Sequence, residues 1–305
     1  MAANYRKQLD DWKNLKDLTR LRVREQFTKA NRPAGTSNEN NAFVLVVDES
    51  TQPIIASIFG RYELVEIGCA SIVRLDIPES RAPQAALDAI YFVRPTPKNL
   101  ELICKDFRMI EKRFNKCFCY CGESNVTLMQ VKAFMYNEVH IFTTDALTPE
   151  AIGILKQSEG LRGQIKTLKQ LAIDYSPVEE NVFTLNMAND LQTLFSCASA
   201  EIQTKAPAMI TEIAKRLVTL CVTLDEKPLV RYSAASEVCQ KIAAEFHSQL
   251  QNFITQYGWD RDRNPNGFHP HRGWRAVELA GTVLIVDRMV DLIAPLLHDF
   301  AYQCA

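Results

Sequence analysis

The chain has 305 residues, of which 47% are apolar and 23% are charged, and its formal net charge is −1. This composition is typical of a globular protein with a substantial core and room for about two domains. A net charge near zero provides no long-range field that would recruit nucleic acid or acidic lipid. No apolar run approaches the roughly 18 residues that span a membrane, and the charged start lacks the apolar core of a signal peptide. We therefore expect a cytoplasmic protein whose nine cysteines are reduced thiols.

Helical and extended patterns alternate along the first half of the chain. Apolar, β-rich runs predict strands at residues 43–48, 89–93 and 139–142, and one more extended segment at residues 169–175. Residues 64–67 and 71–75 are predicted as two short strands or as one strand and its lead-in. Apolar periodicity, prolines in first turns and a threonine cap predict helices at residues 9–29 and 51–59, after Thr96 and from Pro149. The alternation predicts a Rossmann-like α/β first domain with a parallel sheet over residues 1–175.

The second half is more helical. Two apolar stripes predict helices over residues 210–224 and 238–257, and β-rich runs predict strands at residues 229–232 and 276–286. We expect an incomplete α/β second domain at residues 176–294. Pro295 then ends any helix that follows the last strand, and residues 295–305 look like the start of a third, truncated domain. The sequence is therefore expected to be the front portion of a longer protein.

Nucleotide binding is the first function to consider for a parallel sheet. It needs a glycine-rich turn after a strand, so that backbone N–H groups can approach phosphates. Residues 49–53 after Asp48 and residues 288–291 after Asp287 contain no glycine. The sequence therefore predicts no nucleotide cofactor.

Acid–base chemistry is the main alternative. Asp287, Asp291 and His298 follow a predicted buried strand, so the chain could be a small α/β hydrolase or a nucleotide-dependent enzyme using these three residues. The structural interpretation is that Asp287 caps the following turn and Asp291 pairs with Arg288. We favour this interpretation because no nucleophile or glycine-built oxyanion site accompanies the three residues.

Metal binding has three weak candidates. The C-x-C-x-C run at residues 117–121 lacks the spacing of zinc sites. A calcium-like loop begins at Asp260, but Pro265 stands where glycine is needed and His271 where a bidentate glutamate is needed. His269 and His271 are two apart in a loop, where exposed histidines are the simpler interpretation. We expect no metal site.

Several stretches resemble the Sec/Munc (SM) family of syntaxin-binding vesicle-fusion proteins. The family signature is matched by the run from Val283, which contains Asp287, Arg288, Asp291, Pro295 and His298. Residues 43–48, 88–96, 137–145 and 217–232 resemble other family segments in the same order, and the last is most similar to the exocytic Sec branch. The resemblance therefore extends over almost the whole chain.

This resemblance implies a non-catalytic protein. Family members form an arch of three domains whose central cleft holds the helical bundle of a syntaxin. The implied partners are a syntaxin-type SNARE and, as a further candidate, the assembled SNARE complex. The implied function is regulation of vesicle docking and fusion in exocytosis, at the plasma membrane or secretory vesicles, with membrane association only through partners.

Two binding sites follow from the resemblance by position. The syntaxin cleft maps onto Asp48, Gly60, Arg61 and Arg74, although Arg74 stands where neuronal relatives are often acidic. A pocket for a syntaxin N-terminal peptide maps onto Ile152, Ile154 and Gln170. For the two isoleucines, ordinary helix core remains the alternative. Residues 109–130 have no counterpart in relatives and are either a surface insertion or translated intron.

Overall fold

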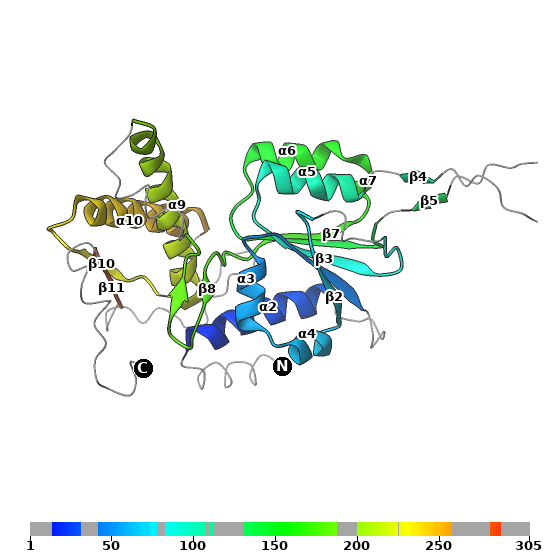
Figure 1. The fold of residues 1–305 in the computed structure, drawn as a ribbon, viewed down its shortest axis with the longest axis horizontal. Helices are drawn as coiled ribbons and strands as arrows, with labels where there is room; N and C mark the ends of the chain where they lie inside the picture. Colours follow the sequence, from blue (N-terminus) through cyan, green and yellow to red (C-terminus); the bar gives the residue numbers. More distant parts are fainter. Residues whose placement is uncertain are drawn as a thin grey trace, which may run out of the picture. The chain divides into compact units, whose positions relative to one another are not determined.

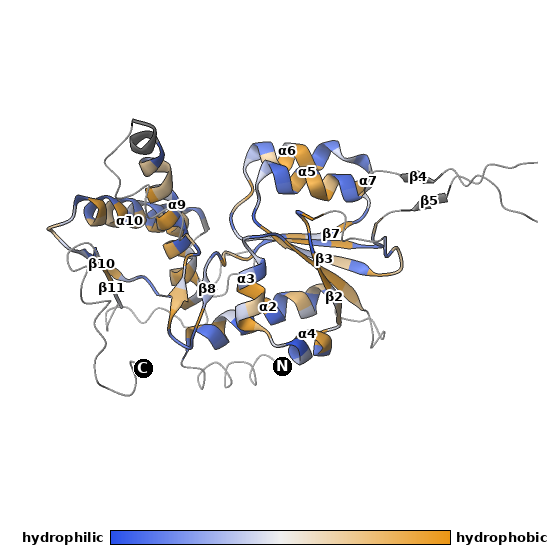
Figure 2. Ribbon diagram, viewed as in Figure 1, coloured by the Kyte–Doolittle hydropathy of each residue, from blue (hydrophilic) through white to orange (hydrophobic). Residues whose placement is uncertain are grey.

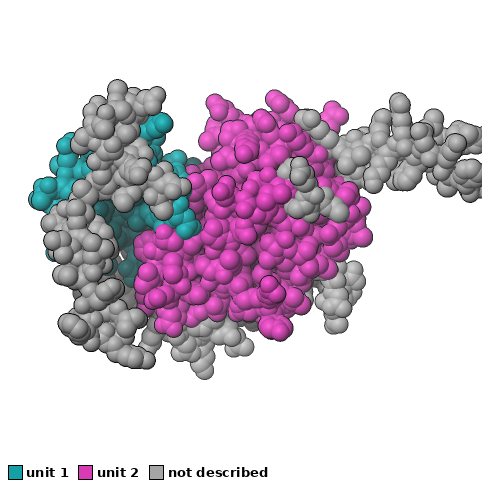
Figure 3. Space-filling model, viewed as in Figure 1, with its two compact units in different colours: residues 1–11, 185–305 teal, residues 12–184 magenta. Residues whose placement is uncertain are grey.

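The computed structural model describes residues 14–31, 42–77, 83–107, 110–112, 131–133, 135–187, 200–224, 226–257 and 281–287. The chain divides into two compact units (Figure 3). One unit is Trp12–Thr184, and the other combines Met1–Asp11 with Leu185–Ala305. The domain boundaries predicted at residues 175 and 294 stay predictions.

A five-stranded parallel sheet organises the unit Trp12–Thr184 (Figure 1). Its strands are β1 (Phe43–Val47), β2 (Cys69–Arg74), β3 (Asp88–Val93), β6 (Val139–Thr143) and β7 (Ile165–Gln170). The order is β2-β1-β3-β6-β7, and every neighbouring pair is parallel. The order reverses between β1 and β3, the place where doubly wound sheets usually hold ligands. The predicted parallel α/β fold of the first domain is confirmed.

Helices precede and connect these strands. They are α2 (Leu15–Asn31), α3 (Gln52–Ile58), α4 (Arg61–Glu66), α5 (Pro97–Asp106), α6 (Pro149–Gln157) and α7 (Glu159–Arg162). The hydroxyl oxygens of Thr96 and Thr148 accept hydrogen bonds from the N–H groups three residues later, and proline follows each threonine. Both caps satisfy N–H groups that a helix start leaves without partners. These helix starts are as predicted.

Two predicted strands are wrong in place or type. Residues 64–67, predicted as a strand, lie mostly in α4, because the Glu63 carboxylate accepts the Gly60 N–H (2.8 Å) and begins a helix there. The strand predicted at residues 169–175 is β7, which begins at Ile165 and ends at Gln170. Residues 171–175 are instead a buried connection.

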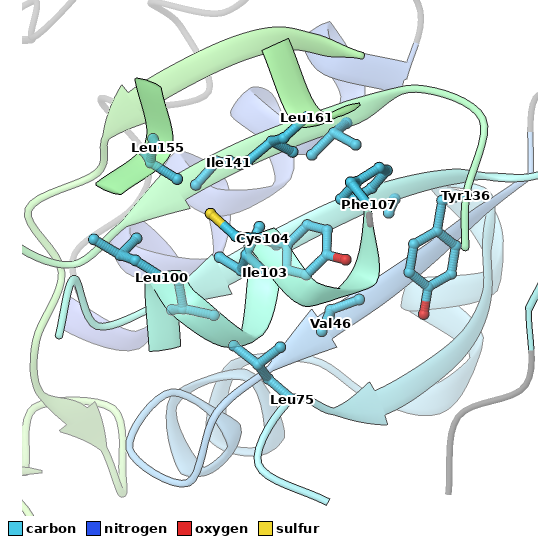
Figure 4. Close-up of a cluster of buried hydrophobic side chains, with 14 of the residues drawn as sticks. Val46, Leu75, Leu100, Ile103, Cys104, Phe107, Tyr136, Ile141, Leu155 and Leu161 are labelled. Atoms are coloured by element: carbon cyan, nitrogen blue, oxygen red, sulfur yellow. The ribbon is translucent and has the colours of Figure 1, made fainter. Parts of the chain in front are cut away.

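Both faces of the sheet are covered, which explains why β1 is apolar at every position. On one face, side chains of α5 and α6 pack on the sheet; Figure 4 shows Leu100, Ile103, Cys104, Ile141 and Leu155 converging there. On the other face, the Phe27 ring of α2 lies 5.6 to 6.5 Å from the rings of Phe43, Phe92 and Phe142. The central strands are therefore hydrophobic along their length, whereas α5 and α6 carry both colours (Figure 2).

Two short antiparallel pairs complete this unit. Strands β4 (Ile110–Lys112) and β5 (Val131–Ala133) are paired at the two ends of the segment predicted as an insertion, whose residues 113–130 lie outside the described part. Strands β8 (Ser176–Pro177) and β9 (Phe183–Thr184) form a hairpin after the sheet.

In the other unit, helices α9 (Ala200–Leu224) and α10 (Glu237–Tyr257) pack together beside a parallel strand pair. The pair is β10 (Leu229–Tyr232) and β11 (Thr282–Ile285). Val230 and Val283 face the helix core. Leu229, Leu284 and Val286 are 57%, 61% and 66% exposed. One face of this strand pair is therefore open to solvent in the chain described here.

Candidate partner-binding surfaces

Asp48 lies at the end of β1, beside the point where the strand order reverses. Its Oδ1 accepts hydrogen bonds from the backbone N–H groups of Ser50 and Thr51 and from the Ser50 hydroxyl, at 2.8 to 3.0 Å. Its Oδ2 accepts from the Arg94 N–H and the Asn99 amide, both at 2.7 Å. The residue is 3% exposed. The chain's own donors therefore surround the carboxylate, and the assignment of Asp48 to the syntaxin cleft stays a prediction.

The Asp48 carboxylate and the donors that bind it fill the switch point of the sheet. The donors that surround Asp48 come from the turns after β1 and β3, which in doubly wound folds reach toward a bound ligand. The Arg94 guanidinium also donates to both oxygens of Asp174 at 2.7 Å. This pair ties the end of β3 to the connection that follows β7. A ligand phosphate would have to displace the Asp48 carboxylate to reach these donors.

Gly60 and Arg61, predicted in the cleft, begin an exposed helix. Gly60 and Arg61 are exposed on α4, and two neighbours that the sequence analysis missed are also open: Tyr62 is 89% and Val65 68% exposed. Leu64 is the side chain that anchors the helix to the core. Tyr62 and Val65 are three residues apart and therefore share a helix face. Periodicity could have identified this face only if α4 had been predicted as a helix.

Helix α4 is held against α2 by arginine side chains. The Arg20 guanidinium donates to the Ile58 carbonyl at 2.6 Å and lies 3.6 Å from the Glu63 carboxylate. Arg24 pairs with Glu66 at 3.4 Å. These contacts join α4 to α2 and to the end of α3. Within the described residues, Arg61 has no ion-pair partner.

Arg74, the fourth predicted cleft residue, ends edge strand β2. Its Nε donates to Asp76 at 3.0 Å, and a second contact joins the same two side chains. This pairing raises the pKa of Arg74 and lowers the pKa of Asp76. Ile72 is 46% exposed and shares a strand face with Arg74 because the two are two residues apart. An exposed apolar side chain therefore accompanies Arg74.

The predicted peptide pocket is divided between α6 and β7. Ile154 packs on the sheet core, with its carbonyl oxygen 3.7 Å from the Cys104 sulfur of α5. At about 100° per residue, Ile152 lies on the opposite flank of α6. It is half-buried, and it is not among the side chains that pack on the sheet core. The alternative of ordinary core therefore applies to Ile154, whereas Ile152 is open to a binding role.

Edge strand β7 adds a residue that the sequence analysis missed. The register pairs Ile141 with Leu168 and Thr143 with Gln170, so Leu168 and Gln170 point to the face that α6 covers. Leu168 is 43% exposed even so. A partly uncovered apolar strip therefore runs along β7 on this face. Leu168 was not identified from the sequence because the strand was predicted to begin at residue 169, four residues after its first residue in the structure.

The signature region is described only up to Asp287. Its Oδ2 accepts a hydrogen bond from the Ser236 hydroxyl at 2.7 Å, and Ser236 precedes α10 and faces the Cys239 N–H at 3.4 Å. Asp287 thus stabilises the start of α10 through Ser236. The predicted role of Asp287 was a different one, the capping of the turn that follows it. Arg288, Asp291, Pro295 and His298 lie outside the described residues, and with them two members of the alternative acid–base trio.

The described residues hold no candidate for a metal site or a membrane span. Among the described residues, no cluster of three or more histidine, cysteine, aspartate or glutamate side chains has the arrangement of a metal site. The candidates at residues 117–121 and 260–271 lie outside those ranges. Within the described ranges, no helix is both long and apolar enough to cross a bilayer.

Within the described residues, the parallel α/β sheet holds the Asp48 carboxylate at its switch point, and exposed apolar side chains stand on α4, β2 and β7. A family model described as the Sec1 family matches residues 43–305. The chain belongs to this family, and the predicted resemblance is confirmed.

Similar proteins agree with this assignment. The chain is 28% identical to protein transport protein sec1 of Dictyostelium discoideum over 290 residues, which are 95% of this chain and 41% of that protein. The solved Unc18–syntaxin 1 complex from Monosiga brevicollis matches with a TM-score of 0.72 at 23% identity, over 95% of this chain and 43% of that one. Sly1p in complex with an N-terminal peptide of Sed5p matches with a TM-score of 0.66 at 19% identity, over 95% and 44%. The chain thus spans about two fifths of the length of the relatives it matches.

Proposed function

We propose that this protein regulates SNARE-mediated vesicle docking and fusion by binding a syntaxin-type SNARE, without catalytic turnover. The observation that carries the proposal is membership of the Sec1 family over residues 43–305. A similar fold is solved with syntaxin 1 in one relative and with a Sed5p peptide in another. The closed switch point also favours binding over chemistry, because the usual ligand position holds Asp48.

The first proposed contact surface is the α4 face. It comprises Gly60, Arg61, Tyr62 and Val65, with Ile72 and Arg74 on the neighbouring edge strand. Exposed aromatic and arginine side chains are frequent anchors of protein interfaces, because aromatic rings bury much area with little loss of conformational entropy and arginine offers several hydrogen-bond donors. Tyr62 and Arg61 have this character. This surface shares Gly60, Arg61 and Arg74 with the predicted cleft, and the buried Asp48 is not part of it.

The second proposed surface is the α6–β7 edge, formed by Ile152, Leu168 and Gln170. A peptide site needs apolar sockets and a few polar groups that fix the peptide backbone. Ile152 and Leu168 supply the apolar part, and the Gln170 amide can donate and accept hydrogen bonds. We assign this edge to an N-terminal syntaxin peptide, and Ile154 to the core beneath it.

We further propose the exocytic branch and a cytoplasmic location at the plasma membrane or secretory vesicles. The support is the similarity to sec1 of Dictyostelium discoideum and the resemblance of residues 217–232 to the Sec branch. Binding of the assembled SNARE complex is part of the same proposal.

Isothermal titration of the full chain against syntaxin cytoplasmic domains tests the function. The panel should contain plasma-membrane, Golgi and endosomal syntaxins and one assembled SNARE complex. We expect the tightest binding to a plasma-membrane syntaxin. Tighter binding to a Golgi or endosomal syntaxin would contradict the exocytic assignment alone, whereas no binding to any member would contradict the function.

A further inference from the structure

The β8–β9 hairpin exposes two valines at its end. Ser176 pairs with Thr184 and Pro177 with Phe183, so Val178 and Val182 stand opposite one another. The Val178 N–H donates to the Val182 carbonyl at 2.8 Å. Residues facing each other in this way have neighbouring side chains. They are 55% and 52% exposed, which makes one apolar spot where turns usually carry polar residues.

Contacts with α2 and with Tyr175 hold this hairpin in place. The Lys16 N–H in the first turn of α2 donates to the Glu180 carbonyl at 3.2 Å. The Tyr175 ring packs edge-on against Phe183 at 5.9 Å, and its hydroxyl lies 2.8 Å from that of Thr19. The two exposed valines therefore sit on a braced element rather than on a free loop.

A hollow of about 560 Å³ lies at the same place, within the unit Trp12–Thr184. Lys16 and the five residues Val178, Glu179, Glu180, Asn181 and Val182 line it. The lining carries two carboxylates against one ammonium group. Among the described residues, neither glutamate has an ion-pair partner. The hollow therefore combines an apolar spot with an excess of exposed negative charge.

We propose that this hollow binds a basic peptide segment that carries an aliphatic anchor. The aliphatic side chain would contact Val178 and Val182, and lysine or arginine side chains on either side would face Glu179 and Glu180. Complementary charge favours this occupant over an acidic segment, which the same carboxylates would repel. The site is separate from the α4 face and the α6–β7 edge, so it does not depend on the proposed function.

The test uses the full chain and fluorescein-labelled synthetic peptides of equal length. One peptide alternates lysine with leucine, a second replaces each lysine by glutamate, and a third replaces each leucine by serine. Fluorescence anisotropy should show binding of the first peptide that weakens as salt is added, because exposed charges are screened. The second and third peptides should bind at least several-fold more weakly.

Two double variants locate the site. Glu179→Gln with Glu180→Gln, and Val178→Ser with Val182→Ser, should each weaken binding of the lysine–leucine peptide by about fivefold, the size expected for exposed charge pairs and small apolar contacts. Glu101→Gln with Glu159→Gln removes two exposed carboxylates elsewhere and serves as the charge-matched control. Equal binding of the acidic peptide, or an unchanged affinity in both double variants, would overturn the proposal. Concentration-dependent dimers that the valine variant abolishes would also overturn it, because the occupant would then be a second copy of the chain.

Discussion

The backbone N–H of Arg94 donates to Oδ2 of Asp48 at 2.7 Å, while the Arg94 guanidinium donates hydrogen bonds to both carboxylate oxygens of Asp174. One residue thus joins the ends of β1 and β3 to the connection after β7. The arrangement replaces a bound ligand by a fixed carboxylate at the switch point of the sheet. Its stability should therefore depend on an anion at that position.

Replacing Asp48 by alanine should lower the free energy of unfolding by about 3 kcal/mol or more, because several buried donors lose their acceptor at about 1–3 kcal/mol each. Added formate should recover part of the loss, since it restores a carboxylate to the vacated space. Urea unfolding in formate and in chloride at matched ionic strength measures both effects.

Asp48→Asn is the informative control for this variant. Its amide fills the space but places an NH₂ group against donors, so it should be destabilised and insensitive to formate. Glu159→Ala, at an exposed position, should differ little from the parent protein. If formate raised the stability of all the proteins alike, a specific anion position at Asp48 would be excluded.

His140 should make the protein less stable in mild acid. Burial lowers its pKa below the ordinary value of 6.5; Asp88 and Glu138 oppose this effect, and Lys166 adds to it. The unfolded chain therefore takes up the proton first as the pH falls below 6.5. Stability should decline from there down to the folded pKa, by up to about 1.4 kcal/mol per pH unit.

Urea titrations at a series of pH values should show this decline in the parent and a flatter profile in His140→Gln, which can keep the contact with the Thr167 hydroxyl (3.0 Å). His247→Gln removes a histidine from an exposed position and is the matched control. A decline that persists unchanged in His140→Gln would assign it to other groups.

Two glycines should respond in opposite directions to alanine. Gly68 has φ of 96°, and its carbonyl oxygen accepts a hydrogen bond from the Phe43 N–H at 2.9 Å, so a Cβ there is strained. Gly68→Ala should destabilise by about 1–2 kcal/mol. Gly153 lies within α6 with open space where a Cβ would stand, so Gly153→Ala should stabilise by up to about 1 kcal/mol. Thermal unfolding of the two variants in parallel checks the contrast, and a change of the same sign in both would contradict it.

The two proposed SNARE-binding surfaces should be separable. Tyr62→Ala should weaken binding of a folded syntaxin domain about tenfold or more, as for an aromatic anchor, and leave a free N-terminal syntaxin peptide unaffected. Leu168→Ser should do the reverse. Calorimetry with both ligands and both variants makes the comparison, with Glu101→Gln as the surface control. If Tyr62→Ala reduced peptide binding as strongly, the assignment of two surfaces would be wrong.

The open face of β10 and β11 should promote association of the chain with itself. Leu229 and Leu284 are more than half exposed there, and contiguous exposed apolar side chains favour aggregation. Leu284→Lys should raise the concentration at which the chain stays monomeric, with little change in unfolding. Light scattering over a concentration series measures this concentration. The control variant Lys241→Leu, which adds an apolar residue on the exposed side of α10, should lower it.

The central strands could be predicted because burial on both faces leaves a clear record in the sequence. Phe43 to Val47 and Val139 to Phe142 are apolar at almost every position, which only a covered parallel strand requires. Helix starts at Thr96 and Thr148 were also readable, since the capping geometry depends on residues within one turn.

Short elements and binding residues were harder to predict. Residues 64–67 have strand-like composition, but a single hydrogen bond from Gly60 to Glu63 decides for the helix. Asp48 has the sequence position of a ligand-facing residue, and only the donors of Arg94 and Asn99, more than forty residues away, show that it is buried. Tyr62 and Leu168 are apolar by type, so their exposure depends on tertiary packing that composition does not record.

The connection at residues 171–175 and the strand β8 that follows it are buried at all seven positions, which is unusual for a loop and a short hairpin strand. The predicted boundary at residue 175 falls inside it. A shortened protein cut there would keep Tyr175 but remove Phe183, against which its ring packs. A cut after Thr184 preserves the hairpin and the link between Tyr175 and Thr19. Proteases should likewise spare residues 171–177 in the native protein, because backbone that lies inside the fold must open before it can enter a protease active site.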